Sequence, residues 1–116
     1  MVRAVRIAVL RRELFEDLVR AHVPTDRRPV HRCPAFVDGQ EFLVEGWPER
    51  PDGFCENAWR AIHTGVMLAA FDADLSRTTV PGKWIACCPD GLRPVVFSIE
   101  PIGPRVPHEG EDTNDR

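Results

Sequence analysis

The fold is decided by the stretch Cys87-Cys88-Pro89-Asp90-Gly91-Leu92-Arg93-Pro94-Val95-Val96-Phe97-Ser98-Ile99. Its Pro89-Asp90-Gly91 segment has the chemistry of a tight turn, because Pro presets φ, Asp can hydrogen-bond to its own backbone and Gly accepts a positive φ. The apolar run from Trp84 to Cys88 precedes this turn, and after it Val95, Phe97 and Ile99 recur at every second position. A period of two is typical of a half-buried strand. The stretch therefore predicts two strands joined by a hairpin.

The rest of the chain supplies two more strands and two helices. Residues 2–11 and 40–45 place their large apolar side chains at every second position and are expected to be strands. Residues 12–22 and 54–71 instead have the period of an amphipathic helix. A connection rich in proline and arginine joins the first helix to the second strand, over residues 23–32. The order β-α-β-α-β-β predicts an α+β fold, with a small, mainly antiparallel sheet covered on one face by two helices.

The helix expected over residues 54–71 is the longest periodic segment and should lie at the centre of the core. Its apolar stripe consists of Cys55, Ala58, Trp59, Ile62, Val66 and Ala69. Gly65 costs about 1 kcal/mol relative to Ala inside a helix, which indicates close packing against a neighbour. Asp52 is expected to cap the N-terminus of this helix. The side chains of Trp47, Trp59 and Trp84 are expected in the core, with Trp47 as an alternative lid over a pocket.

Length, charge and composition limit the class of protein. The chain has 116 residues, which predicts one domain, and we expect it to span residues 1–102. Residues 103–116 are acidic and poor in apolar side chains, and are expected to be a disordered tail. The net charge of -3 gives no electrostatic case for nucleic acid or an anionic membrane as a partner. No apolar run approaches the ~20 residues of a membrane span.

The N-terminal residues lack the uninterrupted apolar region of a signal peptide, because arginines divide them. We therefore expect a cytoplasmic protein whose cysteines are reduced. The sequence is also compatible with a homo-oligomer.

Three motifs occur together in this chain. They read C-P-x-F-x-x-G-Q-x-F from Cys33, G-F-C-x-x-A-W from Gly53 and C-C-x-D-G-x-R-P-V from Cys87. In this combination the chain resembles a family of small bacterial and archaeal single-domain proteins of unknown function. The resemblance covers roughly residues 3–102 and implies one short domain, but it implies no activity. The arginine- and proline-rich connection and Pro89 depart from the pattern.

The four cysteines are expected on three separate elements. Cys33 lies in a loop, Cys55 at the start of the central helix, and Cys87 and Cys88 at the end of a strand. Because adjacent residues of a strand point to opposite faces, at most one of the vicinal pair can join the other two thiols. Three thiolates, with His31 or His63 as a further ligand, would suit zinc, copper(I) or an iron–sulfur centre. No C-x2-C pair is present, however, and free cysteines also serve as small apolar packing groups.

Cys55 is the candidate catalytic thiol. It falls in the first turn of the central helix, where unpaired N–H groups and the helix dipole favour a thiolate. Asp90 and Arg93 flank the hairpin turn, either as a surface ion pair with a turn cap or as a carboxylate and a guanidinium aimed at a ligand. Asp90 or His63 is the candidate proton carrier, although a lone helix histidine is more often a surface residue. The candidate ligand-binding residues are Trp59, Arg93 and Trp47.

Three functions are compatible with this sequence. The first is a small cytosolic binding domain, whose pocket of Cys33, Cys55 and one of Cys87 and Cys88 takes a soft metal or a small ligand. The second is a cofactor-free enzyme acting on a small biosynthetic substrate, with Cys55 as nucleophile or acid–base group and Arg93 holding an anion. The third is an interaction module without chemistry. No Gly-rich phosphate loop, nucleophile elbow or H-E-x-x-H motif points to a particular reaction.

Overall fold

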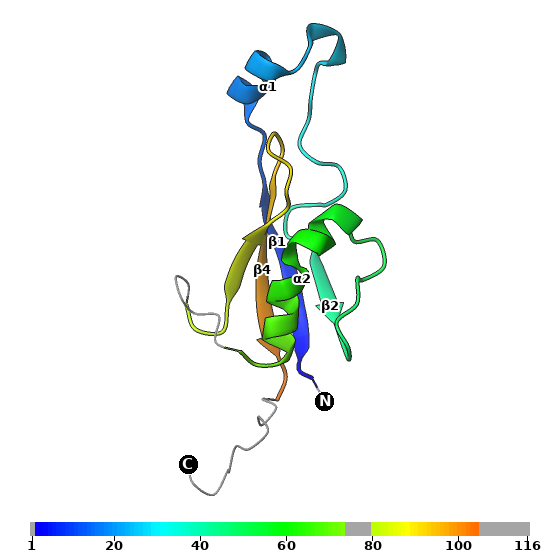
Figure 1. The fold of residues 1–116 in the computed structure, drawn as a ribbon, viewed down its shortest axis with the longest axis vertical. Helices are drawn as coiled ribbons and strands as arrows, with labels where there is room; N and C mark the ends of the chain where they lie inside the picture. Colours follow the sequence, from blue (N-terminus) through cyan, green and yellow to red (C-terminus); the bar gives the residue numbers. More distant parts are fainter. Residues whose placement is uncertain (1, 74–79, 105–116) are drawn as a thin grey trace, which may run out of the picture.

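The computed structural model of the chain describes residues 2–73 and 80–104. A four-stranded sheet with the order β2-β1-β4-β3 is antiparallel throughout, and two helices accompany it (Figure 1). The strands are β1 (Ala4–Arg12), β2 (Glu41–Val44), β3 (Trp84–Cys87) and β4 (Val95–Ile102). The helices are α1 (Glu16–His22) and α2 (Glu56–Ala70), with a short 3-10 turn, η1 (Thr25–Arg27). The predicted α+β class, antiparallel sheet and element order are confirmed. The expected tail lies outside the described residues from residue 105 onward.

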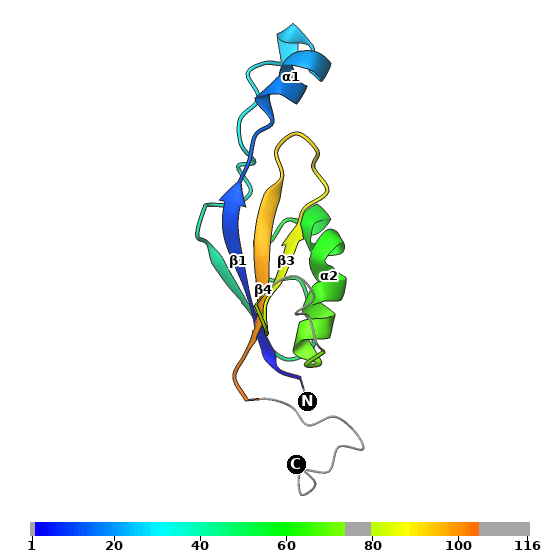
Figure 2. The ribbon, with the colours of Figure 1, turned by 90° about the vertical axis from the view of Figure 1, so that its left-hand side faces the viewer.

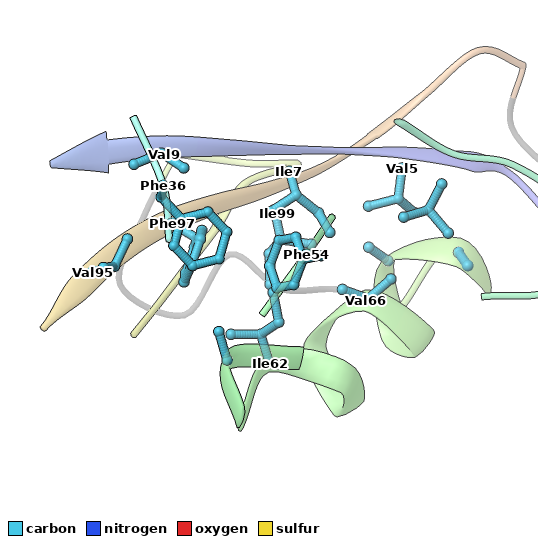
Figure 3. Close-up of a cluster of buried hydrophobic side chains, with 14 residues drawn as sticks. Val5, Ile7, Val9, Phe36, Phe54, Ile62, Val66, Val95, Phe97 and Ile99 are labelled. Atoms are coloured by element: carbon cyan, nitrogen blue, oxygen red, sulfur yellow. The ribbon is translucent and has the colours of Figure 1, made fainter. Parts of the chain in front are cut away.

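The two central strands, β1 and β4, carry the core. Their pairing places Ile7 opposite Ile99, and β3 pairs with β4 so that Ala86 lies opposite Phe97. Alternating side chains of both central strands point to the same face, where they are fully buried. Figure 3 shows these side chains between the sheet and α2. The core thus lies on one face of the sheet, as the period-two pattern predicted.

Helix α2 covers that face. Its buried stripe consists of Ala58, Ile62, Gly65, Val66, Ala69 and Ala70. A Cβ atom built on Gly65 would lie 3.0 Å from Cδ1 of Trp84 and 3.2 Å from Cδ1 of Ile99. The close packing that the sequence predicted at Gly65 is therefore present, and it brings the helix within reach of β3 and β4.

Helix α1 does not cover the sheet, contrary to expectation. It lies beyond the sheet end at which the β3–β4 hairpin turns (Figures 1 and 2). The reason is the length of β1, which continues past an irregularity between Val9 and Arg11 and still pairs with β4 at Arg12. The Phe15 amide also hydrogen-bonds to the Leu92 carbonyl, so the helix begins only where the hairpin ends. We call residues 13–32, which project from the sheet, the arm.

Two local predictions need correction. Cys55, not Asp52, is the N-cap residue of α2, and no side chain hydrogen-bonds to the first turn. The Trp47 side chain is 63% exposed and packs edge-on against Phe71, so it does not belong to the core. Trp59 and Trp84 are only partly buried at the edge of the core. Within the described ranges, no helix has the length and apolar character needed to cross a bilayer.

Candidate functional site: a thiol-lined pocket

Three of the four cysteines meet at one pocket of about 380 Å³, which we call the thiol pocket. Cys33, Cys55 and Cys88 line it from three different segments of the chain. Asp90 and Arg93, which the sequence singled out as flanking the turn, line it as well. Its remaining lining residues are Pro34, Ala35, Phe36, Asn57, Ala58, Pro89 and Val95.

Buried aromatic rings bring these segments together. Phe36, near Cys33, and Phe54, next to Cys55, are almost fully buried, although both lie outside the regular elements. The Phe36 ring lies 5.0 Å from the Phe54 ring and 5.1 Å from the Phe97 ring of β4, each in an edge-on arrangement. Such pairs are favourable beyond the area that they bury. The two loops are therefore held to the sheet by the aromatic neighbours of their cysteines.

A half-buried arginine, Arg12, fixes the loop of Cys33. Arg12 donates one hydrogen bond to the Cys33 carbonyl (3.0 Å) and another to the Asp38 carboxylate (3.0 Å). The hydrogen bond from Arg12 lowers the pKa of Asp38, against a smaller opposing effect of desolvation. The Cys33 loop is thus clamped to the end of β1 at two points.

Cys55 stands at the start of α2. Arg50 donates to the Phe54 carbonyl (2.8 Å), which fixes the approach to the helix. The Cys55 carbonyl accepts the first helical hydrogen bond from the Trp59 amide (2.9 Å). No side chain caps the helix, so the N–H groups of its first turn have no side-chain acceptor. Asn57, which belongs to this turn, lines the thiol pocket.

The vicinal cysteines at the end of β3 differ in their surroundings. The Cys88 amide donates to the Val95 carbonyl (3.0 Å), and the Val95 amide donates to the Cys88 sulfur (3.3 Å). Cys87 is exposed and does not line the thiol pocket. Partial desolvation of its thiol, and secondarily the neighbouring Cys88, raise the pKa of Cys87. Cys88 is therefore the member of the pair that joins Cys33 and Cys55.

Asp90 caps the hairpin turn and pairs with Arg93. Its Oδ1 accepts hydrogen bonds from the amides of Leu92 (2.9 Å) and Arg93 (3.0 Å), and its Oδ2 lies 3.4 Å from Nε of Arg93. Desolvation opposes ionisation of Asp90, but the amide and guanidinium hydrogen bonds outweigh it and lower the pKa of this carboxyl. The turn cap and ion pair that the sequence suggested are both present.

Three other candidate residues lie away from the thiol pocket. His63 packs against Trp59 with 5.2 Å between ring centroids, and neither residue lines the pocket. Trp47 contacts Phe71, at the C-terminal end of α2. The structure therefore brings together Cys33, Cys55, Cys88, Asp90 and Arg93, and leaves Cys87, His63, Trp59 and Trp47 outside.

The thiols do not form a metal centre in this structure. Among residues 2–73 and 80–104, no group of three His, Cys, Asp or Glu side chains lies close enough to hold a metal ion. All four cysteines are free. The arrangement is therefore a pocket with soft, weakly polar walls and one ion pair, Arg93 with Asp90, rather than a ligand set of tetrahedral geometry.

Sequence reasoning missed the polar side chain of Asn57 and the aromatic anchors of the pocket. Asn57 follows the N-cap by two residues, so its place in the first helical turn was a usable signal. Phe36 and Phe54 lie within two of the three motifs, but their irregular backbone has no period that would indicate burial. Comparison with protein-family models, with curated proteins and with solved structures finds no match to this chain. The resemblance to a family of small single-domain proteins stays a prediction.

Proposed function

We propose that this chain is a binding domain for a small anionic molecule, which it takes into the thiol pocket. The observation that carries the proposal is the convergence of Cys33, Cys55, Cys88 and Arg93 on one concave site. A volume of about 380 Å³ lies within the range of small-molecule pockets. Ligand pockets are typically apolar with a few polar groups that set orientation, and this pocket has that composition.

Arg93 supplies the preference for negative charge. Its ion pair with Asp90 engages Nε, and the terminal N–H groups of the guanidinium make no protein hydrogen bond among the described residues. A guanidinium presents several donors in a fixed plane, which suits carboxylate or phosphate oxygens. Asn57 adds an amide that can donate or accept. A small molecule with one anionic end fits these groups better than a bare metal ion does.

A pair of alkylating reagents tests this proposal. Iodoacetate and iodoacetamide react with thiols by the same displacement of iodide, but only iodoacetate is negatively charged. We expect the ratio of the iodoacetate rate to the iodoacetamide rate to be about fivefold higher at Cys33 and Cys55 than at Cys87, which corresponds to the ~1 kcal/mol of a surface charge pair. Mass spectrometry of the labelled peptides gives the rate at each site. The difference should shrink with added salt.

The variant Arg93→Gln should abolish this preference, because it removes the cationic group of the pocket. Arg60→Gln is the matched control, since Arg60 is an exposed arginine paired with Glu56 on α2 and does not line the pocket. The proposal is wrong if iodoacetate shows the same relative rate at Cys33, Cys55 and Cys87, or if both variants lower it equally. Urea denaturation of both variants verifies that the fold is retained.

A second candidate function is a thiol-dependent enzyme without a cofactor. The observation in its favour is the position of Cys55 at the uncapped N-terminus of α2, beside Asn57. Helix N-termini favour the thiolate form. An enzyme of this kind requires Cys55 to react with iodoacetamide at neutral pH much faster than Cys33 and Cys87 do. Equal rates at the three sites would remove this candidate and leave the binding domain.

A further inference from the structure

A second and larger pocket adjoins the thiol pocket. It has a volume of about 580 Å³ and lies between residues 23–34, which include the second half of the arm, and the β3–β4 hairpin. Pro34, Asp90 and Arg93 line both pockets, so the two cavities adjoin at these residues. The residues that line the second pocket but not the thiol pocket are Val23, Arg27, Pro29, Val30, His31, Arg32 and Leu92. We call it the basic pocket.

The charge of the basic pocket differs from that of the whole chain. Three guanidinium groups, from Arg27, Arg32 and Arg93, line it together with one carboxylate, that of Asp90. The chain as a whole has a net charge of -3. A concave site with an excess of positive charge concentrates anions, and here it does so within an acidic protein.

Arg27 and Arg32 differ from most other arginines in lacking a protein partner. Apart from Arg20, the other arginine side chains in the described ranges form ion pairs, as Arg3 does with Asp72, or donate to backbone carbonyls. Arg27 and Arg32 make neither kind of contact with a described residue. Arg32 also contributes through space to the lowered pKa of Asp38, but the Arg12 hydrogen bond dominates that shift.

The backbone that carries these free arginines is nevertheless fixed. The Arg28 guanidinium donates to the carbonyl of Val23 (2.9 and 2.7 Å) and to that of Arg20 (2.8 Å). At the far end of the segment, Arg12 holds the Cys33 carbonyl. Arg28 thus attaches one end of this segment to α1, and Arg12 attaches the other end to β1. Less ordering entropy is then lost when a ligand binds the side chains between them.

We propose that the two pockets form a single elongated site for a phosphate ester. The phosphoryl group lies in the basic pocket against Arg27, Arg32 and Arg93, and the organic part extends past Pro34 into the thiol pocket. A doubly charged group with three free oxygens matches several guanidinium forks, whereas a single carboxylate would leave at least one of them unused. The placement of the organic part rests on the proposed function, while the phosphoryl site does not.

The phosphoryl site is tested with inorganic phosphate. The isotope-labelled full chain is titrated at constant ionic strength, and amide shifts are followed by heteronuclear NMR. We expect saturable shifts at residues 23–34 and 90–93. The double variant Arg27→Gln/Arg32→Gln should weaken binding about tenfold or more, because each lost contact is a charge-assisted hydrogen bond. The matched control is Arg20→Gln, since Arg20 lacks a side-chain partner too but lines a different cavity, at α1.

The link between the pockets is tested with 1-bromo-3-hydroxyacetone phosphate and its unphosphorylated analogue. A pocket thiolate attacks the bromomethyl carbon, so that a carbon–sulfur bond forms, the carbon–bromine bond breaks and bromide leaves. We expect the phosphorylated reagent to label Cys33 or Cys55 with saturation kinetics and at least about tenfold faster than its analogue at low concentration. The double variant should remove this advantage, and Arg20→Gln should keep it.

The outcomes separate the two proposals. Absence of saturable phosphate shifts at residues 23–34 overturns the phosphoryl site, whatever the alkylation ratios are. Phosphate binding that is retained in Arg27→Gln/Arg32→Gln also overturns it. Phosphate binding without faster labelling by the phosphorylated reagent overturns the single elongated site. If the wild-type protein shows no preference for iodoacetate but does show the phosphate shifts, only the proposed function is contradicted.

Discussion

Gly65 and Trp84 are in contact without a side chain between them: a Cβ on Gly65 would lie 3.0 Å from Cδ1 and 3.2 Å from Nε1 of the indole. The same Cβ would lie 3.2 Å from Cδ1 of Ile99, which is fully buried in β4. Helix α2 therefore lies so close to β3 and β4 that any residue with a side chain at position 65 would require its neighbours to shift.

Replacement of Gly65 by Ala is expected to lower the free energy of unfolding by about 1 kcal/mol. The helix gains roughly 1 kcal/mol in intrinsic propensity, but overpacking of a tight core costs about 1–3 kcal/mol. Urea denaturation measures the difference. Thr64→Ala is the control, because Thr64 is exposed on the same turn and its replacement should leave stability equal or slightly higher. A Gly65→Ala protein as stable as wild type would mean that the indole moves aside freely.

Asp90→Ala is expected to destabilise the protein by about 1 kcal/mol. The substitution removes the acceptor of the Leu92 and Arg93 amides at a partly exposed turn. Asp52→Ala is the matched control, since the sequence favours Asp52 as a helix cap but the helix has no side-chain cap. Equal urea midpoints for the two variants would contradict the role of Asp90 as the turn cap.

The same carboxylate predicts a dependence of stability on pH. The folded-state pKa of Asp90 is lowered, so its contribution is fully present above the unfolded value of about 3.9. The contribution is lost as the pH falls through the lower, folded pKa. The difference in unfolding free energy between wild type and Asp90→Asn should therefore be constant near neutral pH and shrink below about pH 4. A difference that grows in acid would have the wrong sign.

Arg12→Gln is expected to loosen the loop of Cys33. It removes the donor to the Cys33 carbonyl and the hydrogen bond that lowers the pKa of Asp38. NMR titration should show the Asp38 pKa returning toward its ordinary value, and iodoacetamide should react faster with Cys33 while its rate at Cys55 is unchanged. Arg11→Gln is the control, because Arg11 pairs with Glu13 instead. An unchanged Asp38 titration would contradict the clamp.

Cys87 is expected to react with iodoacetamide only at a higher pH than an ordinary thiol, although it is exposed. Desolvation, followed by the influence of Cys88, raises its pKa, and the thiolate is the reactive form. The midpoint of its rate–pH profile should move toward the ordinary value in Cys88→Ser and stay in place in Cys55→Ser. A midpoint below that of a free thiol in wild-type protein would be inconsistent with this environment.

The sequence predicted the parts of the fold that have a clear period. Helix α2 and the β3–β4 hairpin were expected within a few residues of their observed bounds, because each buries one face against a neighbour. The place of α1 was not predictable in this way. Its apolar side chains have a helical period, but whether they reach the sheet depends on where β1 stops, and Arg11 and Arg12 continue that strand without an apolar signal.

For the thiol pocket, the sequence indicated the candidate cysteines, Asp90 and Arg93. It did not indicate which of the cysteines line the pocket or what surrounds them. The rule that neighbouring strand residues diverge limits the vicinal pair to one pocket thiol, but only the pocket lining in the structure identifies Cys88 as that thiol. Arg27 and Arg32 were interpreted as part of an irregular loop. They share a cavity with Arg93 because residues 23–32 approach the hairpin, which is distant in the sequence. No local sequence pattern indicates this approach.

The projection of the arm also has a consequence for how the protein opens. Helix α1 buries one residue, Val19, whereas the sheet, α2 and the loops of Phe36 and Phe54 form the core. Amide hydrogens of the arm should therefore exchange with solvent deuterium through a local opening that leaves the sheet protected. Because Arg27 and Arg32 belong to the arm and Arg93 to the hairpin, a bound phosphate would oppose this opening by a factor that grows with its concentration. Deuterium uptake by the arm would then report occupancy of the site directly.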